Sequence, residues 1–159
     1  DMKVLYFSRT RRPEVEDQLG VEWKPDLDSV LSESDFVSLH VPLTAETEHI
    51  IGARELDLMQ PHAFLINTTR GPTIDADALY QALKAGAIKG AALDVTDPEP
   101  IPIDDPLLTL PNLVISPHIA SASSSTIKKM GILTAQNVIG ALSGTQMPSC
   151  LNPEASKGA

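Results

Sequence analysis

Three polar side chains of this sequence are of the types needed to act together on the carbonyl group of a 2-oxo acid. Arg70, Glu99 and His118 each follow a short apolar run that we expect to be a β-strand. Hydride addition to a carbonyl carbon leaves negative charge on the oxygen, and histidine is the side chain best suited to protonate it near neutral pH. A carboxylate beside the ring favours its protonated form, so Glu99 is expected to support His118. The planar guanidinium of Arg70 suits a substrate carboxylate.

Each of these residues also has an interpretation without chemistry. A lone histidine in a turn is more often structural, a lone glutamate in a Pro-rich loop is usually solvated, and Arg70 could cap a helix or pair with Asp75. Their ordered combination favours the catalytic interpretation. No metal site is expected, because no spacing of His, Asp and Glu resembles a ligand set and the chain has one cysteine, Cys150.

The elements that would position these side chains alternate between short apolar runs and helical patterns. Near-continuous apolar runs predict strands buried on both faces of a parallel sheet. Helical spacing between them predicts crossover helices, one of which Pro61 ends and another of which Gly86 caps. The predicted fold is therefore an α/β, Rossmann-like, doubly wound parallel sheet. The predicted strands are Val4–Phe7, Phe36–Val41, Ala63–Ile66, Ala91–Val95 and Leu113–Ile115, and the helical patterns are centred on Leu27–Leu31, Leu56–Met59 and Leu79–Leu83.

A last, longer helix is predicted to begin in the serine cluster 121–125 and to end at Gly144. Its expected packing face carries Ile127, Met130, Thr134, Val138 and Leu142. We therefore assign residues 1–144 to a dinucleotide-binding domain that carries the catalytic residues, and residues 145–159 to a C-terminal tail.

The Gly-rich turn that opens a dinucleotide fold, G-x-G-x-x-G, is absent from the sequence. We therefore expect the sheet to be incomplete, with its first strand and phosphate-binding loop lying before Asp1. Ser8, Arg9 and Thr10 follow the first predicted strand, where such folds recognise the adenosine ribose. Arginine there accommodates a 2′-phosphate, so Arg9, with Arg12 nearby, predicts NADPH rather than NAD. A solvated loop without a ligand is the alternative.

Charge and composition exclude several other classes of protein. The net charge of −9 argues against a nucleic-acid partner. No apolar run approaches the roughly 18 residues that a membrane span requires. The single cysteine suits a reducing, cytoplasmic setting.

Several motifs together resemble the D-2-hydroxyacid dehydrogenase family over essentially the whole sequence. They are Asn67-Thr68-Thr69-Arg70-Gly71, Leu93-Asp94-Val95 with Glu99-Pro100, Asn112-Leu113-Val114 and Ser116-Pro117-His118-Ile119. The resemblance implies that Arg70, Glu99 and His118 are the catalytic residues and that Asp94 lies near the nicotinamide. It further implies a small-molecule 2-oxo or 2-hydroxy acid substrate, a homodimer, and an N-terminal substrate domain that these residues do not include. The residues that it places along the cofactor are Ser8, Arg9, Thr10, Arg12, Val41, Pro42, Thr68, Ala120 and Ser121.

Residues 5–14 and 93–96 most resemble the glyoxylate/hydroxypyruvate reductase branch. NAD-dependent phosphoglycerate or D-lactate dehydrogenases are the nearest alternatives, and the arginines after the first strand speak against them. A formate dehydrogenase is disfavoured because that branch places Gln where Glu99 stands. A non-catalytic, dinucleotide-sensing corepressor is an alternative that retains the same three residues. We expect these 159 residues alone to be poorly folded and inactive.

Overall fold

A computed structural model describes residues 2–154 and shows two compact units, residues 1–118 and 119–159. The first unit is α/β and holds all the strands of the described chain. The second contains one long helix. Each unit is described by itself.

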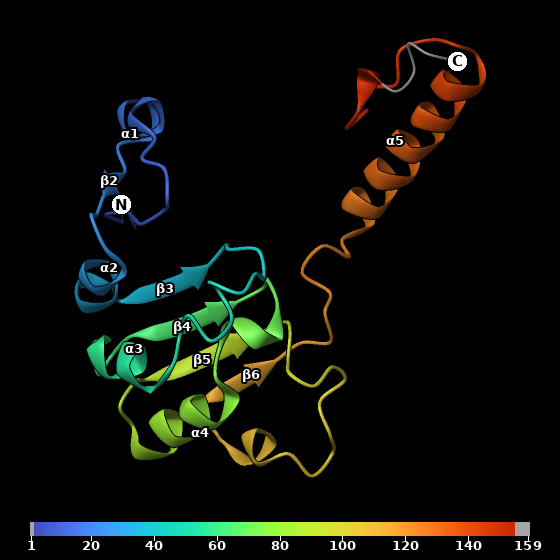
Figure 1. Ribbon diagram of the computed structural model, residues 1–159. Helices are drawn as coiled ribbons and strands as arrows, with labels where there is room; N and C mark the ends of the chain where they lie inside the picture. Colours follow the sequence, from blue (N-terminus) through green and yellow to red (C-terminus); the bar gives the residue numbers. More distant parts are fainter. Residues whose placement is uncertain (1, 155–159) are drawn as a thin grey trace. The chain divides into compact units, whose positions relative to one another are not determined.

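A four-stranded parallel sheet forms the centre of the first unit (Figure 1). The strand order β3-β4-β5-β6 follows the chain, as expected when each strand is linked to the next by a crossover segment. Residues Val37, Leu65, Ala91 and Leu113 lie opposite one another across the sheet. The strands are β3 Phe36–Leu39, β4 Phe64–Asn67, β5 Gly90–Leu93 and β6 Leu113–Ile115.

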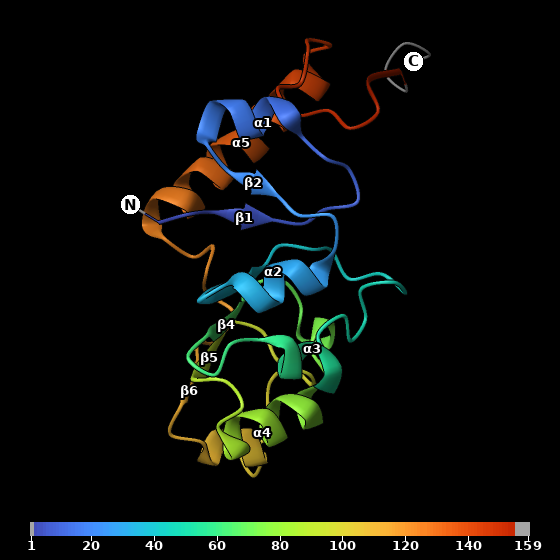
Figure 2. The same cartoon turned by 90° about the vertical axis from the view of Figure 1, so that its left-hand side faces the viewer.

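Three helices bury one face of this sheet, and Figures 1 and 2 show α3 and α4 on the same side of it. Leu31, Leu56 and Leu79 contribute one fully buried side chain from each helix to the core. Asp75 caps the start of helix α4, where its carboxylate accepts the N–H of Ala78 at 3.0 Å, and the left-handed Gly86 caps its end. The helices are α2 Leu27–Glu33, α3 Ala53–Leu58 and α4 Ala76–Ala85.

Taken by itself, the first unit leaves the opposite face of the sheet exposed, and burial of the strands on both faces stays a prediction. Along β3, buried and exposed residues alternate. Phe36 is 61% exposed and Val114 is 68% exposed, and the ring of Phe36 stacks on that of Phe64 with centroids 5.6 Å apart. The apolar side chains that made these runs look continuous are therefore divided between a packed face and an open one.

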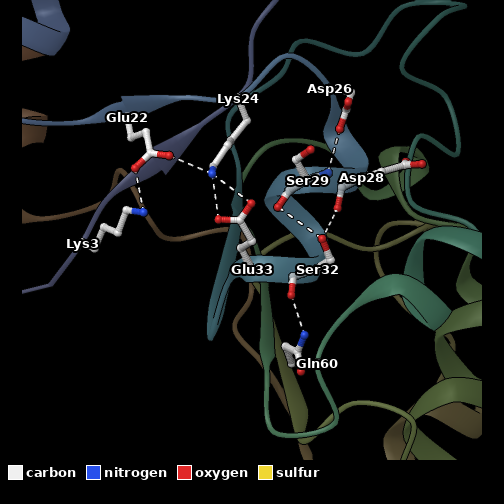
Figure 3. A network of polar contacts seen from close by, with 9 residues as sticks. All are labelled: Lys3, Glu22, Lys24, Asp26, Asp28, Ser29, Ser32, Glu33 and Gln60. Atoms are coloured by element: carbon white, nitrogen blue, oxygen red, sulfur yellow. Dashed lines mark hydrogen bonds and ion pairs between the residues drawn. The ribbon is translucent and has the colours of Figure 1, made fainter.

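A smaller parallel pair, β1 Leu5–Tyr6 and β2 Glu22–Trp23, precedes the main sheet and is linked by α1 Pro13–Leu19. The Lys24 ammonium, with its side chain only 13% exposed, lies 2.8 Å from the Glu22 carboxylate and 2.7 Å from that of Glu33. Lys3 pairs with the other oxygen of Glu22 at 2.6 Å (Figure 3). Because Glu33 belongs to α2, these ion pairs tie the small sheet to the helix that leads into β3.

The second unit contains α5 Ser124–Leu142, whose N-cap Ser123 accepts the N–H of Thr126 at 3.2 Å. The helix thus begins within the predicted serine cluster. Ile127, Met130 and Val138 of its expected packing face are each more than half exposed in this unit, and what the face packs against stays a prediction. In residues 2–154, no helix combines the length and apolar character needed to cross a membrane.

Candidate active site

The three candidate catalytic residues lie in loops that leave the carboxyl ends of neighbouring strands. Arg70 follows β4, Glu99 follows β5 and His118 follows β6. The carboxyl ends of parallel strands share one edge of the sheet, where α/β folds bind their ligands. The structure therefore places all three loops at one edge of the sheet.

His118 and Glu99 are in direct contact. The ring Nδ1 of His118 lies 2.6 Å from Oε1 of Glu99, and both side chains are nearly half exposed. A ring held at Nδ1 by a carboxylate presents its other nitrogen, Nε2, for proton transfer. His118 also has a left-handed backbone with φ 54°, which is uncommon for residues other than glycine and is often found at functional sites.

The loop that carries Arg70 is built on a buried amide. Asn67 is fully buried at the end of β4, and its Nδ2 donates to the Arg70 carbonyl at 2.9 Å and to Thr73 Oγ1 at 3.1 Å. Its Oδ1 accepts the backbone N–H and the hydroxyl of Thr69. Because both amide donors and the carbonyl are used, Asn67 fixes the backbone on both sides of Arg70.

The Arg70 side chain itself is exposed, and its Nη1 donates to the Thr69 carbonyl at 2.6 Å. Asp75, the carboxylate considered as its partner, instead caps α4. Within residues 2–154 the guanidinium forms no ion pair with a protein carboxylate. The loop therefore offers a cation with hydrogen-bonding capacity for an added anion.

Close backbone contact joins the Arg70 loop to the loop that leads to Glu99. Gly71 is buried, and a Cβ atom there would lie 2.0 Å from the carbonyl oxygen of Thr96. Only glycine permits this approach. The sequence motif contained Gly71, but nothing in it indicated which backbone the glycine would meet.

Hydrogen bonds beyond the strand ends connect the loops after β4, β5 and β6. The Asp94 N–H donates to the Asn67 carbonyl at 2.8 Å, and the Ser116 N–H donates to the Leu93 carbonyl at 2.9 Å. The Ser116 hydroxyl also donates to the carboxylate of buried Asp94 at 2.5 Å. The sequence motif contains Ser116 but indicates no role for it, whereas the structure shows that its hydroxyl contacts Asp94.

Four of the predicted cofactor residues lie in the exposed loop between β1 and α1, namely Ser8, Arg9, Thr10 and Arg12. The Ser8 hydroxyl donates to the Thr10 carbonyl at 2.6 Å and closes a tight turn around Arg9. Arg12 precedes the helix, and its guanidinium lies 3.9 Å from the Glu14 carboxylate. The pKa of Glu46 is lowered mainly by a hydrogen bond from Thr44, with a further contribution from the charge of Arg9. Arg9 and Arg12 are thus both exposed, and each places a positive charge on the surface of this loop.

For the remaining predicted cofactor residues, the structure gives their position along the chain and their exposure. Half-buried Val41 and exposed Pro42 follow β3, and exposed Thr68 follows Asn67. Ala120 and Ser121 belong to the second unit, so their relation to the other residues stays a prediction. Among residues 2–154, no group of three or more His, Cys, Asp or Glu side chains is arranged to hold a metal ion.

Comparison with known proteins gives this arrangement a family. Residues 1–120 match the D-isomer specific 2-hydroxyacid dehydrogenase, NAD binding domain. The chain is 51% identical over 156 residues to the glyoxylate reductase of Korarchaeum cryptofilum, an alignment that covers 98% of this chain and 47% of that protein. The chain thus spans about half the length of the curated relatives it matches.

Two solved structures bear on the cofactor. The NADPH-dependent glyoxylate/hydroxypyruvate reductase of Sinorhizobium meliloti, in complex with NADP and malonate, superposes with a TM-score of 0.81 at 35% identity, covering 92% of this chain and 44% of that one. The D-lactate dehydrogenase of Lactobacillus jensenii with NAD⁺ superposes with a TM-score of 0.85 at 31% identity, covering 94% and 48%. From the extent of these matches, the chain belongs to the D-isomer specific 2-hydroxyacid dehydrogenase family and contains that family's NAD-binding fold.

Proposed function

We propose that the polypeptide that carries this chain reduces glyoxylate and hydroxypyruvate to the corresponding 2-hydroxy acids, of D configuration where the product is chiral, by hydride transfer from NADPH. The observation that carries the proposal is the 2.6 Å contact between His118 and Glu99, beside the loop of Arg70. The relatives named as glyoxylate reductases support the substrate class.

Residues of the chain suit two parts of a bound dinucleotide, the ribose 2′-phosphate and the nicotinamide. Arg9 and Arg12 place cationic side chains in an exposed loop after β1, as a 2′-phosphate requires. The loops after β4, β5 and β6 form the edge where the nicotinamide would lie, near buried Asp94. The pyrophosphate is the exception, because the sequence contains no Gly-rich turn to hold it. When bound, the reduced nicotinamide supplies the hydride.

Arg70 and His118 have separate roles in this proposal. The Arg70 guanidinium binds the carboxylate of the 2-oxo acid and so orients its carbonyl group. As hydride adds to the carbonyl carbon, His118 transfers the proton on Nε2 to the carbonyl oxygen, forming the hydroxyl group. The neutral ring then regains a proton from solvent. Glu99 holds Nδ1 throughout and so keeps the ring oriented with Nε2 toward the carbonyl oxygen.

The test is a substrate panel with the complete polypeptide that the gene encodes. Glyoxylate, hydroxypyruvate and pyruvate are each supplied with NADPH or NADH, and the configuration of the chiral products is determined. We expect turnover of glyoxylate and hydroxypyruvate with NADPH at the highest kcat/KM, and D-glycerate as the product of hydroxypyruvate. L-Glycerate, or no turnover with any pair, would contradict the proposal.

An NAD-linked D-lactate dehydrogenase is the second candidate, favoured by the similarity to the Lactobacillus jensenii structure with NAD⁺. It predicts pyruvate and NADH as the best pair in the same panel. A corepressor-like protein predicts dinucleotide binding without turnover. We further propose a homodimer in the cytoplasm, which chromatography with light scattering and fractionation of the source cells would test.

A further inference from the structure

Four side chains hold the loop between β1 and α1, and none of them is among the predicted cofactor residues. Tyr6 comes from β1, Trp23 from β2, Glu16 from α1 and Arg11 from the loop itself. Figures 1 and 2 both show α1 beside the two strands. The loop is thus clamped by every element that surrounds it in the small sheet.

The Tyr6 hydroxyl is the centre of this cluster. It accepts the backbone N–H of Arg12 at 2.8 Å and donates to Oε1 of Glu16 at 2.9 Å. Partial burial raises the pKa of the Tyr6 hydroxyl, so it stays protonated and able to donate. One oxygen atom therefore joins the strand, the end of the loop and the helix.

Arg11 binds the same carboxylate through two parallel hydrogen bonds. Its Nε lies 2.9 Å from Oε1 of Glu16 and its Nη2 lies 2.7 Å from Oε2. The guanidinium also lies over the Trp23 ring, 5.2 Å from the centroid. The hydrogen bond from Arg11 is the main cause of the lowered pKa of Glu16, whose side chain is only 14% exposed.

The three arginines of the loop consequently differ in what they can offer a ligand. The charge of Arg11 is neutralised by a bidentate carboxylate and its flat face rests on an indole. The nearest carboxylate oxygen to the Arg12 guanidinium is 3.9 Å away, and both side chains of that pair are more than half exposed. Arg9 lies at the centre of the turn that Ser8 and Thr10 close.

We propose that Arg11 is a positioning residue for cofactor selection, which acts with Glu16 and Tyr6 to hold the backbone of residues 8–12 so that Arg9 and Arg12 receive a ribose 2′-phosphate. Arg11 does not itself contact the phosphate. The inference rests on the proposed use of NADPH and assigns the preference for a phosphate monoester to two arginines rather than three.

Dissociation constants for NADPH and NADH, measured by nicotinamide fluorescence on the complete polypeptide, test this role. We expect Arg11→Met to weaken NADPH binding by about tenfold, the loss of roughly one charge-assisted hydrogen bond, while NADH binding changes little. Tyr6→Phe removes a single oxygen atom and should weaken NADPH binding several-fold in the same selective way. Glu16→Gln keeps the contact with Tyr6 but loses the charge, so it should give a smaller effect than Arg11→Met.

Matched controls come from the same chain. Arg54→Met removes another exposed arginine that is paired with carboxylates, those of Asp28 and Glu55, and Tyr80→Phe removes the hydroxyl of the only other tyrosine. Neither control should change the ratio of the two dissociation constants. Thermal unfolding of every variant is recorded, and Tyr6→Phe decides the question if Arg11→Met does not fold.

The outcomes separate this inference from the proposed function. If Arg9→Asp leaves the preference for NADPH unchanged, recognition of the 2′-phosphate by this loop is wrong and the proposed cofactor use loses its structural basis. If Arg9→Asp abolishes the preference but Arg11→Met and Tyr6→Phe leave it unchanged, the positioning role is overturned. Equal weakening of NADPH and NADH would overturn it too, because it would show a general structural role. A loss confined to Arg11→Met, with Tyr6→Phe unaffected, would make Arg11 a direct phosphate ligand.

Discussion

The candidate site residues of this domain are held in place by hydrogen bonds with neighbouring residues. Glu99 contacts Nδ1 of His118, and the side-chain amide of Asn67 donates a hydrogen bond to the backbone carbonyl of Arg70. A proton donor and an anion-binding group need defined geometry, because small displacements of reacting groups are costly in rate. The buried amide of Asn67 therefore positions the backbone that carries Arg70.

Replacing Asn67 tests this support directly. Asn67→Ala removes the acceptor of the Thr69 N–H and hydroxyl at a fully buried position. The Arg70 carbonyl loses one donor but keeps the hydroxyl and the N–H of Thr73. We expect the free energy of unfolding to fall by about 1–3 kcal/mol for each group left without a partner. Urea unfolding measures the change. Asn137→Ala, which removes a half-buried amide that accepts the Ser149 N–H, should cost much less, and equal losses would contradict this expectation.

Arg70→Lys tests the two-pronged binding of the substrate carboxylate. Lysine keeps the charge but cannot form two parallel hydrogen bonds, so the loss is about one charge-assisted bond. We expect the KM for glyoxylate to rise roughly 10- to 100-fold, with the dissociation constant of NADPH unchanged. Arg54→Lys on α3 is the matched control. An unchanged KM would remove Arg70 from the substrate site.

At the scale of elements, ion pairs attach the small sheet to α2 and make its stability depend on pH. Hydrogen bonds from Lys24 and then Lys3 lower the pKa of Glu22 from 4.5 to about 2. A carboxyl group whose pKa is lower in the folded state stabilises the fold above its unfolded pKa, and this stabilisation is lost as pH falls. For Glu22 the loss falls between pH 4.5 and about 2.

Glu22→Gln should therefore reduce the fall in Tm between pH 4.5 and 2, since the variant has no carboxyl group to protonate there. Thermal unfolding followed by circular dichroism across this range checks the expectation. Glu48→Gln is the control, because the Glu48 side chain forms no ion pair in residues 2–154. A Tm profile that is identical in wild type and Glu22→Gln would show that this network does not couple the small sheet to the fold.

The elements that could be predicted from the sequence are those with an apolar signal of their own. Strand β6 has the predicted bounds, and Gly86 ends α4 as expected. Helix α1 and strand β2 were missed for physical reasons. Helix α1 has no buried residue and hence no apolar periodicity, and β2 is a two-residue strand that contains a glutamate. Pro13 at the first turn and the left-handed Gly20 after Leu19 were the signals that could have revealed α1.

The candidate site could be predicted only in part, because loop positions follow from strand order whereas contacts do not. The loops of Arg70, Glu99 and His118 reach one edge through the parallel topology, which apolar runs indicate. The close approach of Gly71 to Thr96 and the hydrogen bonds of Asn67 depend on tertiary packing. The predicted cofactor residues included Arg9 and Arg12 but not Arg11, and only the structure shows the contact with Glu16 that sets Arg11 apart.

For the whole molecule, the described residues leave two parallel sheets without a ladder between them. Strands β1 and β3 do not pair within residues 2–154, and apolar side chains such as Phe36 and Val114 are exposed on the main sheet. Unpaired edges and open apolar faces favour association with other chains. The first strand expected before Asp1, and the domain boundary between residues 144 and 145, stay predictions.

These features predict how the 159 residues behave on their own. We expect them to bind a hydrophobic dye strongly, to melt without a sharp transition and to lack glyoxylate reductase activity. Dye fluorescence, circular dichroism and an NADPH assay provide the comparison with the complete gene product. A cooperative melt with measurable turnover from these residues alone would contradict this expectation.

We propose that His118, held by Glu99, protonates the carbonyl oxygen, and a pair of histidine variants tests this role most directly. His62 provides the control, because its Nε2 also contacts a carboxylate, Asp35 Oδ1 at 2.7 Å, but it precedes β4 and so lies at the opposite edge of the sheet. The measurement is the kcat for glyoxylate reduction by NADPH in the complete polypeptide. His118→Ala should lower it by about 10²–10⁴ while His62→Ala leaves it nearly unchanged. Equal kcat values for wild type and both variants would contradict the account.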